Sequence, residues 1–362
     1  GSSGTPTNWV RGSKERFRNT QFIKFGMYQL FGKDPMFIIN TFALGAWATG
    51  MNISMSCLAF AKVKSLGPDL IKIENTINEF GKGHKYIIMG YPPFLKHLVD
   101  HIKFNLFEYD ISFIFGGESM SEGMRDYLLK KGIKKVYSSY GASDLELNIS
   151  SESEFTISLR RALRDNKILR EKILKYTGAL PMIFQYNPAD FLIEESENGE
   201  LITTICRPDY IAPKIRYNIH DKGHIIQHSV LYKILKELNL EKKITPSKTD
   251  LPILLHYGRS DMTVSFFGAN ISPTDIQEVI YLLPELSKVS NSFALKTIED
   301  EHGDKQLIIS IELLKNTKVN QLNSKNFKTT FFEKLEDVNQ DFKKSNEIAH
   351  DQNKTQLLFF KY

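Results

Sequence analysis

The strongest constraint on the fold of this chain is a strand, a helix and a second strand that follow one another directly. Residues 111–115 are apolar and β-prone, which predicts a buried strand. A capping box at Ser119 and Glu122 predicts a helix that ends at Gly132, and residues 134–139 form the next strand. Two strands joined by such a helix lie parallel, with a right-handed crossover. The pattern therefore predicts an α/β domain built on a parallel sheet.

Two polar segments leave the carboxyl ends of these strands. They are "GGES" at 116–119 and "SYGASD" at 139–144. Ligands bind at this edge of open α/β sheets, so we expect the two segments to converge on one crevice. Upstream, residues 86–102 predict another strand and helix, with Pro92 and Pro93 in the first helical turn, where a missing N–H costs little.

The pattern becomes β-rich after about residue 180. Residues 191–205 predict a hairpin that turns at Asn198-Gly199. Residues 214–227 predict a second hairpin that turns at 221–223. We interpret this region as a barrel-like β subdomain attached to the α/β sheet.

The last hundred residues predict a small α+β domain. It begins with a capped helix that has Ser272 as N-cap, Pro273 at its first position and Asp275 near its positive end. A strand, a turn at Gly303-Asp304, a second strand, one long lysine-rich helix and a last strand at 355–360 follow. The predicted domains are 1–260 and 261–362.

Composition narrows the class of protein. The net charge is +5 at pH 7 without a zinc-finger, RNP-like or helix-turn-helix pattern, which favours a lysine-rich surface over nucleic-acid binding. The two cysteines, Cys57 and Cys206, lie among apolar or small residues, so we expect buried thiols, no disulfide and a reducing, cytoplasmic compartment. No apolar run is long enough to span a bilayer and no signal peptide is seen, so no membrane partner is expected.

Four stretches together resemble the adenylate-forming (acyl/aryl-CoA ligase) superfamily. They are "GGESM", "YGASDLE", "YNIHDKG" and "GRSDMTVSFFGANISPTDIQEV", and they look closest to the phenylacetate-CoA ligase and coenzyme F390 synthetase branch. The resemblance runs from residue 1 to about residue 285. It implies that ATP and Mg²⁺ activate a carboxylic acid, of aryl or small apolar type, to an acyl-adenylate. The acyl group would then pass to the thiol of coenzyme A.

Other outcomes of the same resemblance stay open. The acceptor could be an amine or a carrier protein, and a relative could keep the fold as a non-catalytic nucleotide-binding protein. A homodimer also stays open. The lysine with which the family contacts the carboxylate during adenylation has no match in "LLFFKY" at the end of the chain, so we assign no residue to it.

The first seven residues, "GSSGTPT", have two interpretations. They are either linker sequence or the last part of the family's phosphate loop. The resemblance implies the phosphate loop. The given residues would then begin inside that loop's motif. Glycines allow a close backbone approach, and hydroxyls follow the β- and γ-phosphates. The residues implied in phosphate binding are Ser2, Ser3, Gly4 and Thr5.

The resemblance also implies where the nucleotide lies. Tyr140, flanked by Ser139 and Gly141, would stack on the adenine. Asp221 would accept both ribose hydroxyls, and Arg259 would be a second ribose or phosphate contact. His220 stands where the family has glycine. The segment that would run beside the base contains Gly117, Glu118 and Ser119.

Further residues are implied in catalysis and motion. Ser143 would contact the acyl-adenylate or phosphate, and Asp144, where the family usually has Glu, would hold magnesium, with Glu146 as an alternative. Asp261 resembles the hinge about which the C-terminal domain pivots.

Two segments have competing interpretations. Residues 40–53, with Phe42, Gly45 and Trp47, either line the acyl pocket or form a helix packed in the core. The histidines at 220, 224 and 228 have a spacing that suggests metal ligands on a helix. Gly223 and "HIIQH" favour a strand there instead.

Overall fold

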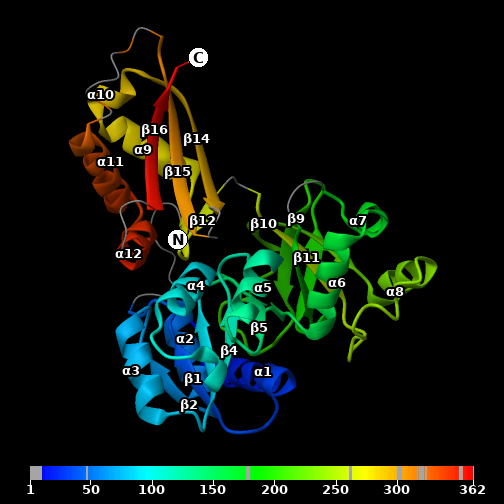
Figure 1. The fold of residues 1–362 in the computed structure, drawn as a ribbon. Helices are drawn as coiled ribbons and strands as arrows, with labels where there is room; N and C mark the ends of the chain where they lie inside the picture. Colours follow the sequence, from blue (N-terminus) through cyan, green and yellow to red (C-terminus); the bar gives the residue numbers. More distant parts are fainter. Residues whose placement is uncertain are drawn as a thin grey trace. The chain divides into compact units, whose positions relative to one another are not determined.

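The computed structural model describes residues 10–45, 48–176, 180–260, 263–299, 304–315, 317, 322, 324–349 and 354–361. These residues divide into two compact units (Figure 1). The larger unit contains the described residues up to Ser260, and the smaller unit contains those from 263 onward.

The larger unit is built on an 11-stranded sheet in the order β2-β1-β3-β4-β5-β6-β7-β11-β10-β9-β8. The strands of its first half are parallel. They are β1 (Met36–Asn40), β2 (Lys62–Ser65), β3 (Lys85–Gly90), β4 (Asp110–Phe115) and β5 (Val136–Tyr140). The predicted parallel pair is confirmed, because Phe115 of β4 lies in register with Ser138 of β5.

Helices precede and connect these strands. They are α1 (Ser13–Phe31), α2 (Ala48–Cys57), α3 (Leu70–Phe80), α4 (Pro92–His101), a short 3₁₀ turn η1 (Leu106–Glu108) and α5 (Glu122–Lys130). Pro92 and Pro93 occupy the first turn of α4, as the sequence predicts. After α5, Gly132 has a left-handed φ of 109°, which is typical of a glycine that ends a helix.

The predicted cap of α5 is wrong by two residues. Ser121, not Ser119, is the N-cap, and its hydroxyl accepts a hydrogen bond from the Met124 N–H at 3.2 Å. Glu122 is the first helical residue, so it cannot close the predicted capping box. Its buried carboxylate instead accepts from Arg125 at 3.1 Å and from Arg160 at 2.7 Å.

The second half of the sheet is antiparallel. Its strands are β6 (Ser150–Ser151), β7 (Met182–Tyr186), β8 (Phe191–Glu195), β9 (Glu200–Ile205), β10 (Tyr217–Ile226) and β11 (Ile253–Arg259). The helices of this half are α6 (Glu154–Asp165), α7 (Lys167–Ile173) and α8 (His228–Glu237). The hairpin at Asn198-Gly199 is confirmed, with Gly199 at a φ of 77°. The sequence suggests a barrel-like subdomain here. In the structure these strands continue the parallel sheet through β6, and the strand order does not close on itself.

The predicted second hairpin is also wrong, because residues 217–226 form one strand. β10 pairs with β9 on one side and with β11 on the other. The residues that were expected to form the turn lie at two shifts in the pairing register. One shift lies between Asn218 and Lys222 and the other between Lys222 and Gly223. A β-bulge accommodates such residues without reversing the chain.

Both thiols were expected to be buried, but only one of them is. Cys57, at the end of α2, is buried, and burial raises the pKa of its thiol to about 12. Cys206 is exposed, because it follows β9 directly where the strand ends. Among the described helices, none combines the length and apolar character needed to cross a bilayer.

The smaller unit has its own apolar core. Its elements are β12 (Val264–Phe266), β13 (Ala269–Ile271), α9 (Pro273–Leu282), α10 (Pro284–Ser287), β14 (Ser290–Glu299), β15 (Lys305–Leu313), α11 (Lys325–Val338), α12 (Gln340–Ala349) and β16 (Thr355–Phe360). Strands β14, β15 and β16 form one sheet, and β12 and β13 form a second. Ser272 caps α9, as predicted, and Asp275 completes a capping box with it. Gly303 lies outside the described residues.

The predicted long C-terminal helix is two helices that meet at Asn339. This side chain donates to the Asn270 carbonyl and to Asp275, both at 2.9 Å. Its amide oxygen accepts from the Phe342 N–H at 2.8 Å. Asn339 thus ends α11, caps α12 and anchors both to the start of α9, which the helical periodicity of the sequence does not reveal.

Candidate functional site

The structure brings Tyr140, Asp221 and Arg259 together. The Tyr140 hydroxyl donates to Asp221 Oδ2 at 2.6 Å. Asp221 and Arg259 are cross-strand partners in β10 and β11, and Arg259 Nη1 lies 4.0 Å from Asp221 Oδ1. Burial and the Asp221 carboxylate raise the pKa of Tyr140, so this phenol stays protonated as a donor.

His256 joins this cluster, although the sequence analysis did not single it out. Its ring packs 4.5 Å from the Tyr140 ring, and Nε2 lies 3.4 Å from Asp221 Oδ2. This buried nitrogen has no hydrogen bond of good geometry within the described residues. A carboxylate offers about four acceptor positions, of which the Tyr140 bond uses one. The Asp221 carboxylate therefore keeps acceptor positions beyond the one that Tyr140 uses. The signal in the sequence is a histidine directly after the apolar run "PILL" and three residues before Arg259.

The backbone before Asp221 adopts a left-handed conformation of the kind that glycine favours, although residue 220 is a histidine. His220 has a left-handed φ of 64°, which is uncommon for a residue with a side chain. Asn218 accepts from the His220 N–H at 2.8 Å, and the His220 carbonyl accepts from the Ser260 N–H at 2.7 Å. The His220 ring also lies 3.1 Å from Glu200. These contacts hold the conformation that places Asp221.

The loop after β5 requires glycine at position 141. A Cβ on Gly141 would lie 2.3 Å from the Leu147 carbonyl oxygen. The Ala142 N–H donates to the Glu146 carbonyl at 2.9 Å, and the Ile149 N–H donates to the Tyr140 carbonyl at 2.9 Å. The loop thus folds back on itself, and Ser139 bonds Asn148 at 2.9 Å at its base.

The segment that follows β4 approaches this loop, as the parallel strands predict. A Cβ on Gly116 would lie 3.0 Å from the Ser139 carbonyl oxygen. Gly117 has a φ of 78°, and a Cβ there would lie 2.7 Å from the Tyr91 ring. Glu118 is buried, and Ser119 precedes the cap of α5.

Asp144 lies beside residues from the start of β10. Its Oδ2 accepts from the Tyr217 hydroxyl at 3.2 Å. Lys214, which the sequence analysis did not single out, is only 4% exposed, and burial together with the Arg11 charge lowers its pKa. The Asp144 carboxylate acts in the opposite direction on Lys214. Asp144 thus accepts from a phenol and lies near a lysine charge.

Glu146 is engaged in a buried polar network. Its carboxylate pairs with Arg11 at 3.0 Å and with Arg207 at 2.8 Å, and it accepts from the Tyr210 hydroxyl. Both Glu146 and Arg207 have side chains only 1% exposed. Glu146 therefore holds the loop in place and is a poor alternative ligand for magnesium.

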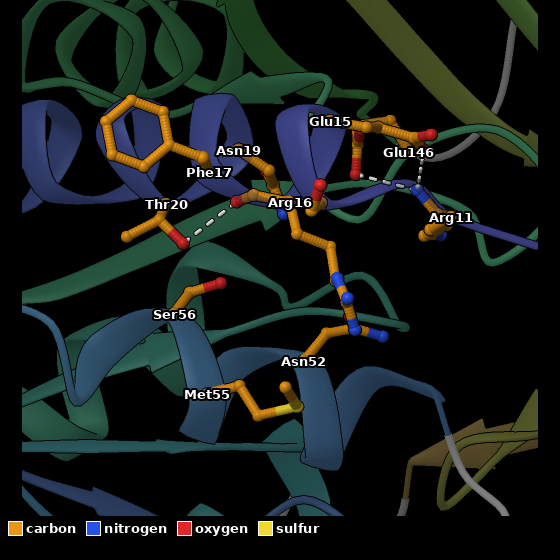
Figure 2. Close-up of a pocket in the computed structure, with 11 residues that line it drawn as sticks. Arg11, Glu15, Arg16, Phe17, Asn19, Thr20, Asn52, Met55, Ser56 and Glu146 are labelled. Atoms are coloured by element: carbon orange, nitrogen blue, oxygen red, sulfur yellow. Dashed lines mark hydrogen bonds and ion pairs between the residues drawn. The ribbon is translucent and has the colours of Figure 1, made fainter. Parts of the chain in front are cut away.

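A cavity lies between α1, α2 and Glu146, at the edge of this loop (Figure 2). Its volume is about 250 Å³. Arg11, which lines it, also donates to the Ser143 carbonyl at 2.9 Å and the Leu145 carbonyl at 3.3 Å. The cavity thus borders the loop that carries Ser143 and Asp144.

The remaining predicted residues stay apart from this cluster or outside the described residues. Ser2, Ser3, Gly4, Thr5, Trp47 and Asp261 lie outside the described residues. Phe42 is buried against Tyr91, with the ring centroids 4.9 Å apart. The three histidines face different carboxylates, which are Glu200 for His220, Glu195 for His224 and Asp250 for His228.

No protein-family model and no curated protein matches the sequence. Solved structures match the fold. A 2-hydroxyisobutyryl-CoA ligase in complex with 2-HIB-AMP and CoA gives a TM-score of 0.68 at 12% identity, over 99% of this chain and 69% of the ligase. The amide bond synthetase McbA from Marinactinospora thermotolerans gives 0.60 at 11% identity, over 99% and 64%. A malonyl-CoA ligase with methylmalonyl-CoA and AMP bound gives 0.55 at 10% identity, over 100% and 69%.

These likenesses extend over nearly the whole chain, whereas the chain spans about two thirds of the solved proteins. At such low sequence identity, these likenesses show the fold alone. The chain therefore shares its fold with these two CoA ligases and the amide bond synthetase.

Proposed function

We propose that the protein is an AMP-forming acid–thiol ligase. The carboxylate of the substrate attacks the α-phosphate of ATP, which gives an acyl-adenylate and pyrophosphate. The thiol of coenzyme A then takes the acyl group and releases AMP. The observation that carries this proposal is the cluster of Tyr140, Asp221, His256 and Arg259 beside the carboxyl edge of the sheet.

The cluster suits a nucleoside. Asp221 accepts ribose hydroxyls with the acceptor positions that Tyr140 leaves, and His256, 3.4 Å away, supports the Asp221 carboxylate from the side. The Tyr140 ring stacks beside the adenine. Gly117, Glu118 and Ser119 pass beside the base, while Ser2, Ser3, Gly4 and Thr5 follow the β- and γ-phosphates.

The loop of residues 140–149 supplies the remaining contacts. Ser143 contacts the phosphate of the adenylate, and Asp144 holds Mg²⁺. The metal neutralises charge on the phosphate oxygens when it is bound. Catalysis rests mainly on positioning and on stabilisation of developing charge.

The two parts of the chain have different tasks in this proposal. Residues 1–260 form the adenylating domain, and 261–362 form a domain that pivots about Asp261 between the two half-reactions. We infer from the sequence motifs a position nearest the phenylacetate-CoA ligase branch, and from the cysteine usage a reducing, cytoplasmic compartment. An Asp261→Pro variant should lose the thioester step more than adenylation, and equal loss of both would exclude the hinge.

An amine is the second candidate acceptor. The similarity in fold to an amide bond synthetase supports an amine as an alternative acceptor of the acyl group. Pyrophosphate release from ATP, Mg²⁺ and a panel of acids tests the first half-reaction. Mass spectrometry of the product with coenzyme A or with an amine then identifies the acceptor.

A further inference from the structure

A buried ion pair lies at the base of the loop of residues 140–149. Arg125 comes from α5, and Glu152 lies two residues before α6 (Figure 1). Arg125 Nη2 donates to both oxygens of the Glu152 carboxylate, at 2.8 and 3.0 Å. Each of the two residues is only 1% exposed. The contacts of these two side chains reach both of the segments that form the candidate site.

Glu152 ties the end of β5 to the chain that leaves the loop. Its Oε2 accepts from the Ser138 N–H at 2.7 Å, and its own N–H donates to the Ser138 carbonyl at 2.9 Å. Ser138 lies two residues before Tyr140, whose cross-strand partner in β6 is Ser150. Glu152 thus holds together the two strands from which the loop extends.

Arg125 connects the same strand to the segment that follows β4. Its Nη1 donates to the Val136 carbonyl in β5, and its Nε donates to Glu122 at 3.1 Å. Glu122 also accepts from Arg160 at 2.7 Å, and Arg160 donates to the Met120 carbonyl at 2.8 Å. One buried network therefore holds the segment between β4 and α5 and the base of the loop.

Stability alone does not account for charges at this place. Replacing a buried ion pair by apolar side chains of similar volume is often neutral or stabilising. The guanidinium of arginine is a planar fork whose donors point in fixed directions. Here the fork of Arg125 serves three acceptors, which are Glu122, Glu152 and the Val136 carbonyl. These directed bonds favour one arrangement of the backbone around the guanidinium.

We propose that Arg125 and Glu152 are positioning residues for the loop of residues 140–149. The pair acts through the backbone of β5, which sets the Tyr140 hydroxyl against Asp221. Loss of the pair frees the base of the loop and weakens that contact. The expected effect on adenylation rests on the proposed function, whereas the effect on the contact between Tyr140 and Asp221 does not.

A double-mutant cycle tests the proposal by urea unfolding of the full chain. Arg125→Lys keeps the positive charge, but a single ammonium cannot serve the three acceptors of the fork. Tyr140→Phe should lower the urea midpoint of the wild type, because it removes the bond to Asp221. In the Arg125→Lys background, Tyr140→Phe should lower the midpoint by less than about half as much, since only uncoupled sites give additive effects.

Arg161→Lys is the matched control. Arg161 donates to the same Glu122 carboxylate at 3.1 Å and to Asp126 at 2.6 Å, and its hydrogen bonds within the described residues are limited to these two acids. Tyr140→Phe should keep its full effect in this background. An undiminished effect of Tyr140→Phe in Arg125→Lys, or an equal reduction in both lysine backgrounds, would overturn the inference.

A second background keeps the test decisive if Arg125→Lys does not fold. The double variant Arg125→Met and Glu152→Met removes both charges of the pair together, so neither partner is left as an uncompensated buried ion. Tyr140→Phe should again lose more than about half of its effect on the urea midpoint. A full effect in this background would overturn the inference in the same way.

Pyrophosphate release from ATP, Mg²⁺ and a panel of acids separates this inference from the proposed function. Arg125→Lys should lower kcat by about 100-fold, because small misplacements of a site cost about that much, and Arg161→Lys should leave it unchanged. Reduced coupling of Tyr140 with no release by the wild type would retain the positioning role and reject the ligase. Release by the wild type, with coupling and kcat unchanged in Arg125→Lys, would retain the ligase and reject the positioning role.

Discussion

The Tyr140 hydroxyl lies 2.6 Å from Asp221 Oδ2, although their strands are four positions apart in the sheet. In a flat sheet, strands so separated would be about 19 Å apart at the usual spacing. The sheet must therefore curl between β5 and β10, even though its strand order is open. This curl brings the two residues together at one site.

Asp221→Ala should lower the affinity for ATP by about 100-fold, because it removes charge-assisted hydrogen bonds to the ribose. Tyr140→Phe should have a smaller effect, since it removes only a donor to the carboxylate. Calorimetric titration with ATP measures both. Asp250→Asn, which alters an exposed carboxylate, is the control. Unchanged ATP affinity in Asp221→Ala, with the fold intact by circular dichroism, would exclude this site.

Asp144→Asn should raise the Mg²⁺ concentration needed for half-maximal activity by about tenfold, because a neutral amide is a weaker ligand for this hard cation. A magnesium titration of pyrophosphate release provides the measurement. Asp165→Asn changes an exposed acid near the end of α6 and should leave the titration unaltered. An identical magnesium dependence in Asp144→Asn and the wild type would contradict the assignment.

Glu146→Ala should destabilise the larger unit by about 3–5 kcal/mol, because it leaves the buried Arg207 without its carboxylate. Urea unfolding followed by circular dichroism measures this loss. Glu171→Ala breaks an exposed ion pair with Lys167 and should cost less than about 1 kcal/mol. Similar losses in the two variants would mean that Glu146 does not anchor the loop.

His220→Gly should be more stable than His220→Ala by about 1–2 kcal/mol, because only glycine adopts a left-handed φ without a steric cost. Both variants lose the contact between the ring and Glu200, so their difference isolates the backbone term. Thermal unfolding compares them directly. Equal stabilities would contradict the left-handed conformation that places Asp221.

Glu200 gives the protein a specific response to acid. Hydrogen bonds from Ser260, Asn218 and His220 lower its pKa from 4.5 to about 2. The ionised carboxylate is thus favoured in the folded state, so its stabilisation is present above about pH 4.5 and is lost as the pH falls towards 2. The difference in urea midpoint between wild type and Glu200→Gln should shrink from pH 6 to pH 3. A constant difference would show that Glu200 is not stabilised as an anion.

Local signals in the sequence predicted what a few neighbouring residues decide. Pro92 and Pro93 mark a helix start, Asn198-Gly199 a turn and Ser272 a cap, and each depends on contacts within about four residues. Ser119 and Ser121 both resemble caps, however, and only the buried partners of Glu122 distinguish them. A local pattern offers no way to choose between such alternatives.

The motifs led us to expect that their residues lie together, whereas nothing in the sequence revealed the partners that come from distant segments. Tyr140, Asp221 and Arg259 meet as their motifs suggest. Arg11, Arg207 and Lys214 belong to no motif, and their contacts with the loop around Glu146 appear only after the chain folds. The turn predicted at 221–223 failed because pairing with two neighbouring strands outweighs the local preference for a turn.

Acid-dependent release of pyrophosphate from ATP and Mg²⁺ tests the central claim most directly. The wild type should release pyrophosphate only when a suitable carboxylic acid is present, and Asp221→Ala should show none above background. Release that needs no acid, or equal release by wild type and Asp221→Ala, would contradict the proposed adenylation at this site.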